Sequence, residues 1–442
     1  MGVTLAIYYL TPWIRWDRGP NLPDQAVLVD LAGRRFYFFW IEIWPHEFYF
    51  VAGLLIMAGL GLFLFTSALG RVWCGYTCPQ TVWTDLFILV ERWIEGDRNA
   101  RVKLHHAKWS LRKLRLRVTK WVVWLLIALA TGGAWVFYFT DAPTLLADLV
   151  VFQAPYVAYA TIAVLTATTF IFGGFMREQV CIYMCPWPRI QAAMMDPDTI
   201  TVAYRDWRGE PRGKHMKRTA EAPKGDCIDC NACVAVCPMG IDIRDGQQLD
   251  CITCALCIDA CDDVMAKIGK PRGLIDYVSL VDAENERAGK APKPIWRHIL
   301  RPRTVIYTAI WAAFGVALVY ALFIRSPIDV TVAPVRNPTY VLLSDGGIRN
   351  TYDLRIRNMH PVDTEFALSV TGAEGLSLTV EGRDADAVTV GADQTGQVRV
   401  YVEADAGTPS AQSDESSITL WIADVASTDR VGKTTTFNGT GE

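Results

Sequence analysis

The sequence predicts a multi-domain membrane protein: an α-helical transmembrane bundle of about five spans, an inserted cysteine-rich domain and a C-terminal all-β sandwich. Three observations carry this prediction. Long apolar runs recur along the chain, eight of its 12 cysteines fall in one doubled motif, and the residues after 329 alternate between apolar and polar side chains. The 442 residues are 51% hydrophobic, and the formal net charge of −3 by itself excludes no class of partner.

Four apolar runs are long enough to cross a bilayer. Residues 48–69 contain no charged side chain, and a helix of that length at ~1.5 Å per residue covers roughly 33 Å, enough for the hydrocarbon core. Similar runs lie at 119–140, 155–176 and 304–324, with tryptophans near their ends as at membrane interfaces. One such run could be a buried core helix, but four indicate an integral membrane protein.

Residues 3–16 are apolar and aromatic but shorter than the ~20 residues of a full span. A signal peptide would need a positively charged start and a small-residue cleavage site, and neither is evident. We therefore expect a first transmembrane helix whose beginning is shortened, which gives five spans in all.

The distribution of Lys and Arg predicts the topology. Loop 71–118 carries ten of these residues and loop 141–154 carries none, so the first should be cytoplasmic and the second should lie outside. Arg177, Arg301 and Arg303 then flank the cysteine-rich block on the cytoplasmic side. This arrangement places the N-terminus inside and the C-terminal block on the opposite side of the membrane.

The cysteine-rich block reads C-x2-C-x2-C-x3-C twice, starting at Cys227 and at Cys251. This spacing is typical of bacterial ferredoxins with two [4Fe–4S] clusters, in which the fourth cysteine of each run ligates the other cluster. Pro238 after the first run fits that pattern, and Asp262 after the second departs from it.

The doubled spacing therefore predicts two sets of cluster ligands. We assign one [4Fe–4S] cluster to Cys227, Cys230, Cys233 and Cys261. We assign the second to Cys251, Cys254, Cys257 and Cys237. Zinc is an alternative because C-x2-C pairs can bind it, whereas disulfides are disfavoured on the reducing side of the membrane.

A second pair of motifs, C-x3-C-P, follows two of the spans. Cys74 and Cys78 come after the run at 48–69, and Cys181 and Cys185 come after 155–176. Both spans lead to the cytoplasmic face in the predicted topology, so the four thiols should meet there. Four soft thiolates suit Cu(I), zinc or iron–sulfur. Copper, a third cluster, disulfides and simple helix-end packing all stay open for these cysteines.

The residues after 329 alternate in short runs separated by Gly, Asp, Asn and Pro. The runs centre on Leu354, Leu368, Leu378, Val400 and Leu420. Short half-buried strands at this spacing predict an antiparallel, immunoglobulin-like sandwich that lacks a disulfide because it has no cysteine. From 325 onward, 17 Asp and Glu outnumber 9 Lys and Arg, which is typical of a solvated binding module.

These observations divide the chain into four parts. Residues 1–176 hold transmembrane helices, a cytoplasmic loop and the first C-x3-C-P motif. Residues 177–303 form a cytoplasmic region with the second motif and a ferredoxin-type domain at about 220–270. Residues 304–324 are the last transmembrane helix, and 329–442 are the sandwich. No haem or flavin motif is present, so the electron donor should be external and cytoplasmic, or should bind without a recognisable motif.

The order of these parts resembles the FixG/RdxA/CcoG family over nearly the whole chain. Local stretches that carry the likeness are RVWCGYTCPQTVWTDLF, FMREQVCIYMCP, DPDT and GDCIDC. The N-terminus departs from the family, whose members usually carry a longer polar lead before the first span.

The resemblance implies a protein of the bacterial inner membrane that supports assembly of cbb(3)-type cytochrome c oxidase. The implied activity is that of a copper oxidoreductase that reduces Cu(II) to Cu(I) for a copper-transporting ATPase. Electrons would reach copper held by Cys74, Cys78, Cys181 and Cys185, and the periplasmic sandwich would dock the oxidase or an assembly factor.

Two other functions stay open. The C-x3-C-P pairs also resemble those of membrane ferredoxin-type subunits in periplasmic nitrate and nitrous oxide reduction, so the chain could carry electrons between a quinol pool and a periplasmic reductase. It could also be an iron–sulfur scaffold that holds assembly factors together. A homodimer is open as well, and nothing indicates nucleic-acid binding.

Overall fold

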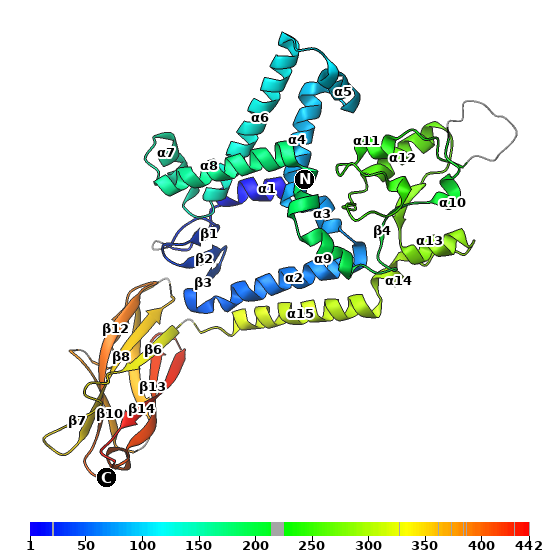
Figure 1. Ribbon diagram of the computed structural model, residues 1–442. Helices are drawn as coiled ribbons and strands as arrows, with labels where there is room; N and C mark the ends of the chain where they lie inside the picture. Colours follow the sequence, from blue (N-terminus) through cyan, green and yellow to red (C-terminus); the bar gives the residue numbers. More distant parts are fainter. Residues whose placement is uncertain are drawn as a thin grey trace. The chain divides into compact units, whose positions relative to one another are not determined.

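The computed structural model describes every residue except 20, 21, 214–224, 327, 361, 373, 383, 386, 428 and 442. The chain divides into two compact units (Figure 1). The first comprises Met1–Trp16 and Gln25–Leu318, and the second comprises Asp17–Asp24 and Val319–Glu442. The units are described separately below.

Four helices in the part of the chain that the structure describes are long and apolar enough to cross a membrane. They are Pro45–Leu69, which contains α2 (Tyr49–Leu69), Leu111–Val136 (α6), Tyr156–Met176, which contains α8 (Tyr156–Ile171), and Pro302–Phe323 (α15). They coincide with the four apolar runs in the sequence. The expected first span is shorter: α1 covers only Gly2–Leu10 and a 3₁₀ turn follows at Thr11–Trp13. Five spans and their orientation therefore remain predictions.

The segment between α1 and α2 contains a small sheet that the hydrophobic pattern did not predict. Its antiparallel strands follow the order β1-β2-β3 and cover Val27–Asp30, Arg35–Phe38 and Ile41–Ile43. Buried Gln25 connects this sheet to the bundle, because its amide nitrogen donates to Phe137 O at 2.7 Å and its amide oxygen accepts from Ala142 N at 3.0 Å.

Shorter helices join or flank these elements. Within the described residues of the first unit they are α3 (Val72–Tyr76), α4 (Pro79–Glu95), α5 (Arg98–His106), α7 (Ala142–Val150), α9 (Trp187–Met194), α10 (Asp206–Gly209), α11 (Ala232–Val236), α12 (Leu256–Lys267), α13 (Leu280–Arg287) and α14 (Ile295–Ile299).

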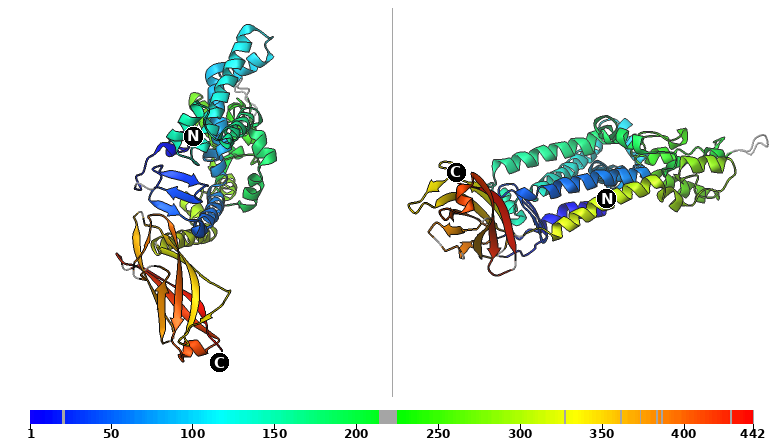
Figure 2. Two further views of the ribbon diagram at one scale, coloured as in Figure 1. Left: turned by 90° about the vertical axis from the view of Figure 1, so that its left-hand side faces the viewer. Right: turned by 90° about the horizontal axis from the view of Figure 1, so that it is seen from below.

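Helices α2 and α15 lie side by side and run in opposite directions (Figures 1 and 2). A Cβ at Gly53 would meet Leu318, whereas one at Gly61 would meet Trp311. The Trp311 indole donates to Met57 O at 3.0 Å. Small residues on α2 therefore allow close packing of the kind that membrane helices use.

Helices α4, α6 and α8 form the other packed group. Trp124 of α6 is 1% exposed and donates from its indole to Phe87 O of α4 at 3.1 Å. The chain beyond α8 approaches them through two glycines, because a Cβ at Gly173 would lie 2.3 Å from the Phe87 ring and one at Gly174 would lie 3.0 Å from Trp124. This packing fixes the end of α8, from which the second C-x3-C-P motif departs.

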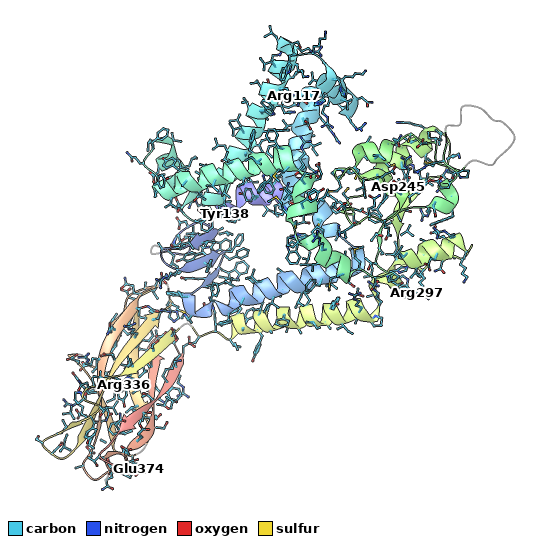
Figure 3. The ribbon with its side chains drawn as sticks, in the orientation of Figure 1. Arg117, Tyr138, Asp245, Arg297, Arg336 and Glu374 are labelled. Carbon is cyan, nitrogen blue, oxygen red and sulfur yellow. The ribbon has the colours of Figure 1, made fainter. Side chains whose placement is uncertain are left out.

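A buried charge network also joins α4 to α6. Lys120 is 2% exposed and lies 3.1 Å from Glu91 Oε1 and 2.9 Å from Glu95 Oε1. Arg177, just after α8, contributes its guanidinium to Glu91 at 3.0 Å. Arg117, labelled in Figure 3, lies 3.6 Å from Glu95.

The cysteine-rich part of the first unit packs α11 and α12 against a two-stranded antiparallel sheet. The strands are β4 (Thr201–Tyr204) and β5 (Ile275–Val278). Val202, Met265 and Leu274 are buried in the same core as three of the cysteines, which are Cys227, Cys233 and Cys261.

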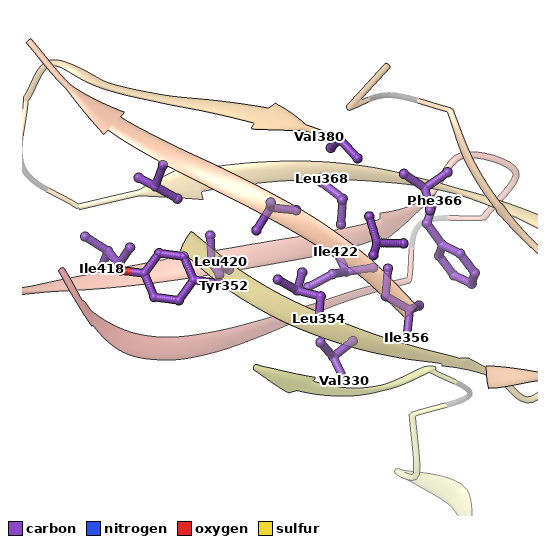
Figure 4. Close-up of a cluster of buried hydrophobic side chains, with 14 of the residues drawn as sticks. Val330, Tyr352, Leu354, Ile356, Phe366, Leu368, Val380, Ile418, Leu420 and Ile422 are labelled. Atoms are coloured by element: carbon purple, nitrogen blue, oxygen red, sulfur yellow. The ribbon is translucent and has the colours of Figure 1, made fainter. Parts of the chain in front are cut away.

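The second unit is a β-sandwich (Figure 4). One sheet has the order β10-β12-β8-β6, with β7 also paired to β8, and the other has the order β11-β9-β13-β14. The strands cover Ile328–Pro334 (β6), Val341–Leu342 (β7), Ile348–Asn358 (β8), Thr364–Thr371 (β9), Leu376–Val380 (β10), Val388–Val390 (β11), Thr395–Ala404 (β12), Glu415–Asp424 (β13) and Arg430–Asn438 (β14), and α16 covers Pro409–Gln412. All five alternating runs of the sequence lie in these strands.

The interior of the sandwich is apolar. Leu354, Leu368, Val400 and Leu420 lie in its core, labelled in part in Figure 4. Buried Tyr352 of β8 donates its hydroxyl to Thr436 O of β14 at 2.7 Å. That bond connects the two sheets and satisfies a polar group in the core.

Candidate functional site

The two cysteine runs adopt the same backbone conformation. Asp229 and Asn231 have φ values of 54° and 57°, and the corresponding residues of the second run, Thr253 and Ala255, have 57° and 63°. Left-handed residues without glycine are uncommon. Their recurrence at matched positions turns each loop back on itself and leads it into a short helix, α11 or α12.

The structure groups the eight cysteines around two separate cavities. One is lined by Cys227, Cys230, Cys233 and Cys261. The other is lined by Cys237, Cys251, Cys254 and Cys257, and Cys233 lines this cavity as well. These are the two sets assigned from the spacing, with the fourth cysteine of each run placed at the cavity of the other. The metal-ligand role of each thiol remains a prediction.

The electrostatics of these thiols fit a bound metal cluster. Burial raises the pKa of Cys254 to about 11 and the pKa of Cys257 to about 12, and the charges of neighbouring cysteines add to the effect. The pKa of Cys261 is raised to about 12 for the same reasons. Four thiolates in such a cavity require compensating positive charge, which iron supplies. All 12 cysteines are free of disulfides.

The two C-x3-C-P motifs form equivalent turns. The Cys78 amide donates to Trp73 O at 2.9 Å, and the Cys185 amide donates to Val180 O at 2.9 Å. In each motif the second cysteine thus closes a wide, π-type turn onto the residue before the first cysteine. Pro79 then begins α4, and Pro186 caps α9.

Three of the four motif thiols share one cavity. Cys74, Cys78 and Cys185 line an apolar cavity of about 700 Å³ beside α2, together with Trp73, Trp187 and Gln191. Cys181 is not among the lining residues, but burial and then the charges of Cys78, Cys185 and Cys74 raise its pKa to about 12. All four thiols are therefore close enough to influence one another electrostatically.

No three Cys, His, Asp or Glu side chains are arranged to hold a single metal ion in the part of the chain that the structure describes. A copper ion bound by all four motif thiols would therefore require these side chains to close around it.

Polar side chains hold the motifs in place. The Cys74 thiol donates to Gln191 Oε1 at 3.2 Å, and the Thr81 hydroxyl donates to Cys74 O at 2.6 Å. Gln80, directly after the first motif, bonds to the segment that leads into the second, because its amide nitrogen donates to Phe172 O at 3.0 Å and to Arg177 O at 3.1 Å.

The first motif lies directly against the second cluster loop. A Cβ at Gly75 would lie 2.6 Å from Ile252 O and 3.2 Å from the Cys254 backbone. The hydroxyl of Tyr76 donates to Cys254 O at 3.3 Å and lies 3.0 Å from the Tyr277 hydroxyl. The structure therefore brings the first C-x3-C-P motif into direct contact with the loop that carries Cys251 and Cys254.

The sequence did not identify Gln80, Gln191 and Gly75 as parts of this site. Gln80 and Gly75 belong to the CGYTCPQ stretch, so their proximity to the cysteines was a usable signal. Gln191 lies on α9 and reaches Cys74 only through the tertiary fold.

Comparison with protein families agrees with this arrangement. A family model described as a 4Fe-4S dicluster domain matches residues 176–280, and one described as a 4Fe-4S binding domain matches residues 50–98. The second range contains only Cys74 and Cys78 as cysteines. A model described as the IG-like fold at the C-terminus of FixG matches residues 318–440.

Three relatives are similar along most of their length. Protein RdxB of Cereibacter sphaeroides is 68% identical over 100% of this chain and 93% of its own length. Protein RdxA of the same species is 64% identical over 93% of this chain and 87% of its own. Nitrogen fixation protein FixG of Rhizobium meliloti is 54% identical over 91% of this chain and 82% of its own. This chain, with its 4Fe–4S binding domains, apolar helices and IG-like domain, belongs to the FixG/RdxA family.

Proposed function

We propose that this iron–sulfur redox protein is a membrane-bound copper oxidoreductase, which reduces Cu(II) to Cu(I) at the C-x3-C-P thiols. The observation that carries the proposal is the contact between the first motif and the second cluster loop, at Gly75 and Cys254. [4Fe–4S] clusters held by the eight ferredoxin-type cysteines supply one-electron transfer. Direct contact of the two loops keeps the transfer distance short.

The thiols favour the reduced ion. Each Cu(II) takes up one electron, which comes from a cytoplasmic donor outside this chain, and the product Cu(I) is the softer ion that thiolates prefer. Cys74, Cys78, Cys181 and Cys185 bind the metal, while Gln191 and Gln80 orient the two motifs through the hydrogen bonds described above.

The proposed physiological role is copper delivery for assembly of a cbb(3)-type cytochrome c oxidase. Cu(I) would pass to a copper-transporting ATPase in the bacterial inner membrane. In the proposed topology the cysteine-rich part is cytoplasmic, and the sandwich is periplasmic, where it docks the oxidase or an assembly factor.

A second candidate is electron carriage between the quinol pool and a periplasmic reductase. The apolar cavity of about 700 Å³ favours it, because an apolar pocket beside redox-active thiols fits a quinol ring and its tail. Reduction of the clusters by added quinol, indifferent to copper, would support this candidate over the first.

The test is metal and sulfide analysis of anaerobically purified full-length protein, with EPR after dithionite and again after Cu(II). We expect about eight iron and eight sulfide per chain, the content of two [4Fe–4S] clusters, and loss of the reduced signals as Cu(I) accumulates. Cys→Ser at each C-x3-C-P position should abolish copper reduction and leave both cluster signals intact. Tyr183→Phe is the matched control, because Tyr183 lies in the second motif and is 78% exposed.

Two outcomes contradict the proposal. If copper reduction survives all four substitutions, the C-x3-C-P thiols do not take part in it. About twelve iron per chain, the content of three [4Fe–4S] clusters, would show that the thiols hold a further cluster and that copper binds elsewhere.

A further inference from the structure

Arg71 is a buried cation at the place where three segments meet: the first C-x3-C-P motif, the chain that follows the second motif, and the second cluster loop. It immediately precedes α3, three residues before Cys74, and is 3% exposed. Its side chain also lines a cavity of about 220 Å³ together with Gln248, Cys251 and Thr253. An arginine excluded from water at this place requires partners, and those partners show what its charge can influence.

The hydrogen-bond partners of Arg71 come from these segments. One guanidinium nitrogen donates to Leu249 O, two residues before Cys251, and another donates to Pro188 O, three residues after Cys185. The Arg71 amide donates to Thr253 Oγ1 at 3.4 Å. One residue thus joins the first motif, the helix α9 that follows the second motif, and the second cluster loop.

These partners are neutral. In the residues that the structure describes, no carboxylate forms an ion pair with Arg71. Burial lowers the pKa of Arg71, and the charges of Cys74, Cys251 and Asp250 act in the opposite direction. Arginine stays protonated even so. Its positive charge is therefore directed at thiols of the second cluster cavity and of the first motif.

The first cluster cavity has an arginine of a different kind. Arg244 lines the cavity of Cys227, Cys230, Cys233 and Cys261. Its guanidinium lies 2.7 Å from Asp229 Oδ1 and 2.6 Å from Asp242 Oδ2. Two carboxylates offset part of this positive charge, although Arg244 still acts to lower the pKa of Cys233. The first cavity therefore gains less net positive potential than an arginine without a carboxylate partner would supply.

Other charged side chains act on both cavities, and they do not remove the difference between Arg71 and Arg244. Asp85 and Asp250 act on the second cavity through Cys254 and Arg71. Asp242 and Asp262 act on the first through Cys233 and Cys261. The first cavity thus has nearby carboxylates and a paired arginine, whereas the second has nearby carboxylates and an unpaired one.

We propose that Arg71 makes the centre held by Cys237, Cys251, Cys254 and Cys257 easier to reduce than the centre held by Cys227, Cys230, Cys233 and Cys261. A buried positive charge stabilises the state with one more electron, and the stabilisation is larger in a low-dielectric interior than in water. One electron then moves downhill from the first centre to the second, with no bond made or broken. The difference directs electrons toward the C-x3-C-P thiols that touch the second loop.

The test is an EPR-monitored redox titration of the full-length protein in detergent, without copper. Arg71→Gln should shift the second centre to a more negative potential and leave the first unchanged. We expect a change of ~10-fold in the equilibrium between the two centres, which corresponds to ~59 mV for one electron. Arg71→Lys keeps the charge and should retain most of the wild-type potential, although it loses the forked hydrogen bonds. Arg244→Gln is the matched control and should move only the first centre.

An unchanged second potential in Arg71→Gln protein with full iron content overturns the proposal. If that variant does not retain its iron, Asp250→Asn provides the second measurement, because removal of a negative charge should shift the second centre to a more positive potential. No shift in that variant would also overturn it. Since no copper is present, failure here leaves the proposed copper reduction untouched, and failure of copper reduction leaves this inference untouched.

Discussion

Gly75 lies against the main chain of Cys254, and the contact is so close that a single Cβ at position 75 would come 2.6 Å from Ile252 O. The contact joins the first C-x3-C-P motif to a ferredoxin-type loop that is far away in sequence. Gly75 brings the two loops together, but it has no side chain that could bind a metal. A substitution there can therefore change the distance between the loops without removing a candidate ligand.

Gly75→Ala should therefore slow electron transfer without removing a ligand. The added methyl group must push the 74–78 turn away from residues 252–254, since backbone atoms cannot yield as a flexible side chain can. We expect copper reduction to fall severalfold, because electron transfer slows as the distance between the two centres grows. Stopped-flow oxidation of the dithionite-reduced protein by Cu(II) measures this. Gly133→Ala is the control, because a Cβ there meets nothing within 4 Å, and equal rates in both variants would contradict the prediction.

Binding of Cu(I) should strengthen as the pH rises. Burial, followed by the charge of Cys78, raises the pKa of the Cys74 thiol to about 11, and burial raises that of Cys181 to about 12. At neutral pH both groups are protonated in the metal-free protein, so binding must release protons. Affinity should therefore increase by about tenfold per pH unit for each proton released. Competition with a Cu(I) chelator at pH 6, 7 and 8 checks the slope, and an affinity independent of pH would show that these thiols are not the ligands.

Lys120→Ala should destabilise the helical part of the first unit. The substitution leaves Glu91 and Glu95 buried without their shared cation. Breaking a buried pair by removing one partner costs about 3–5 kcal/mol, part of which Arg177 and Arg117 offset. Thermal unfolding in detergent measures the loss. Lys108→Ala is the control. Lys108 is exposed and lies shortly before α6, so this substitution should change the midpoint of thermal unfolding little.

Residues 319–442 should fold when prepared alone, because the core of the sandwich consists of its own strands. In that fragment Tyr352→Phe removes the hydrogen bond to Thr436 O and should lower the free energy of unfolding by about 0.5–1.5 kcal/mol. Urea unfolding followed by circular dichroism gives the difference. A fragment that shows no cooperative transition would contradict the independence of the sandwich.

The parts of this fold that the sequence predicted have strong periodic or spacing signals. Four helices long enough to cross a membrane follow from long apolar runs, and the sandwich follows from alternation around residues such as Leu354 and Leu420, which are fully buried in β8 and β13. The sheet β1–β3 was missed because its strands have only three or four residues, too few to establish a period. The apolar run at 3–16 was expected to span the membrane, but its helix ends at Leu10 and a Pro12-containing turn follows.

The sequence predicted which cysteines belong to the site. It did not predict which residues of distant segments touch one another there. Spacing alone grouped Cys237 with the second run, and the structure places it at that cavity. Nothing in the spacing indicates that Gly75 touches Cys254 or that Arg71 reaches Leu249 O, because these contacts depend on how distant segments pack.

The wide turns of the two C-x3-C-P motifs fix the number of residues between the two cysteines of each motif. In each turn the amide of the second cysteine bonds to the carbonyl of the residue five positions earlier, at Trp73 or Val180. Substitution of the three intervening residues preserves this closure, whereas deletion of one of them would leave the turn a residue short and rotate the second thiol away from the first. Sequence drift between these cysteines can therefore change side chains, except at Gly75 where a Cβ would meet Ile252 O, but it can neither add nor remove a residue.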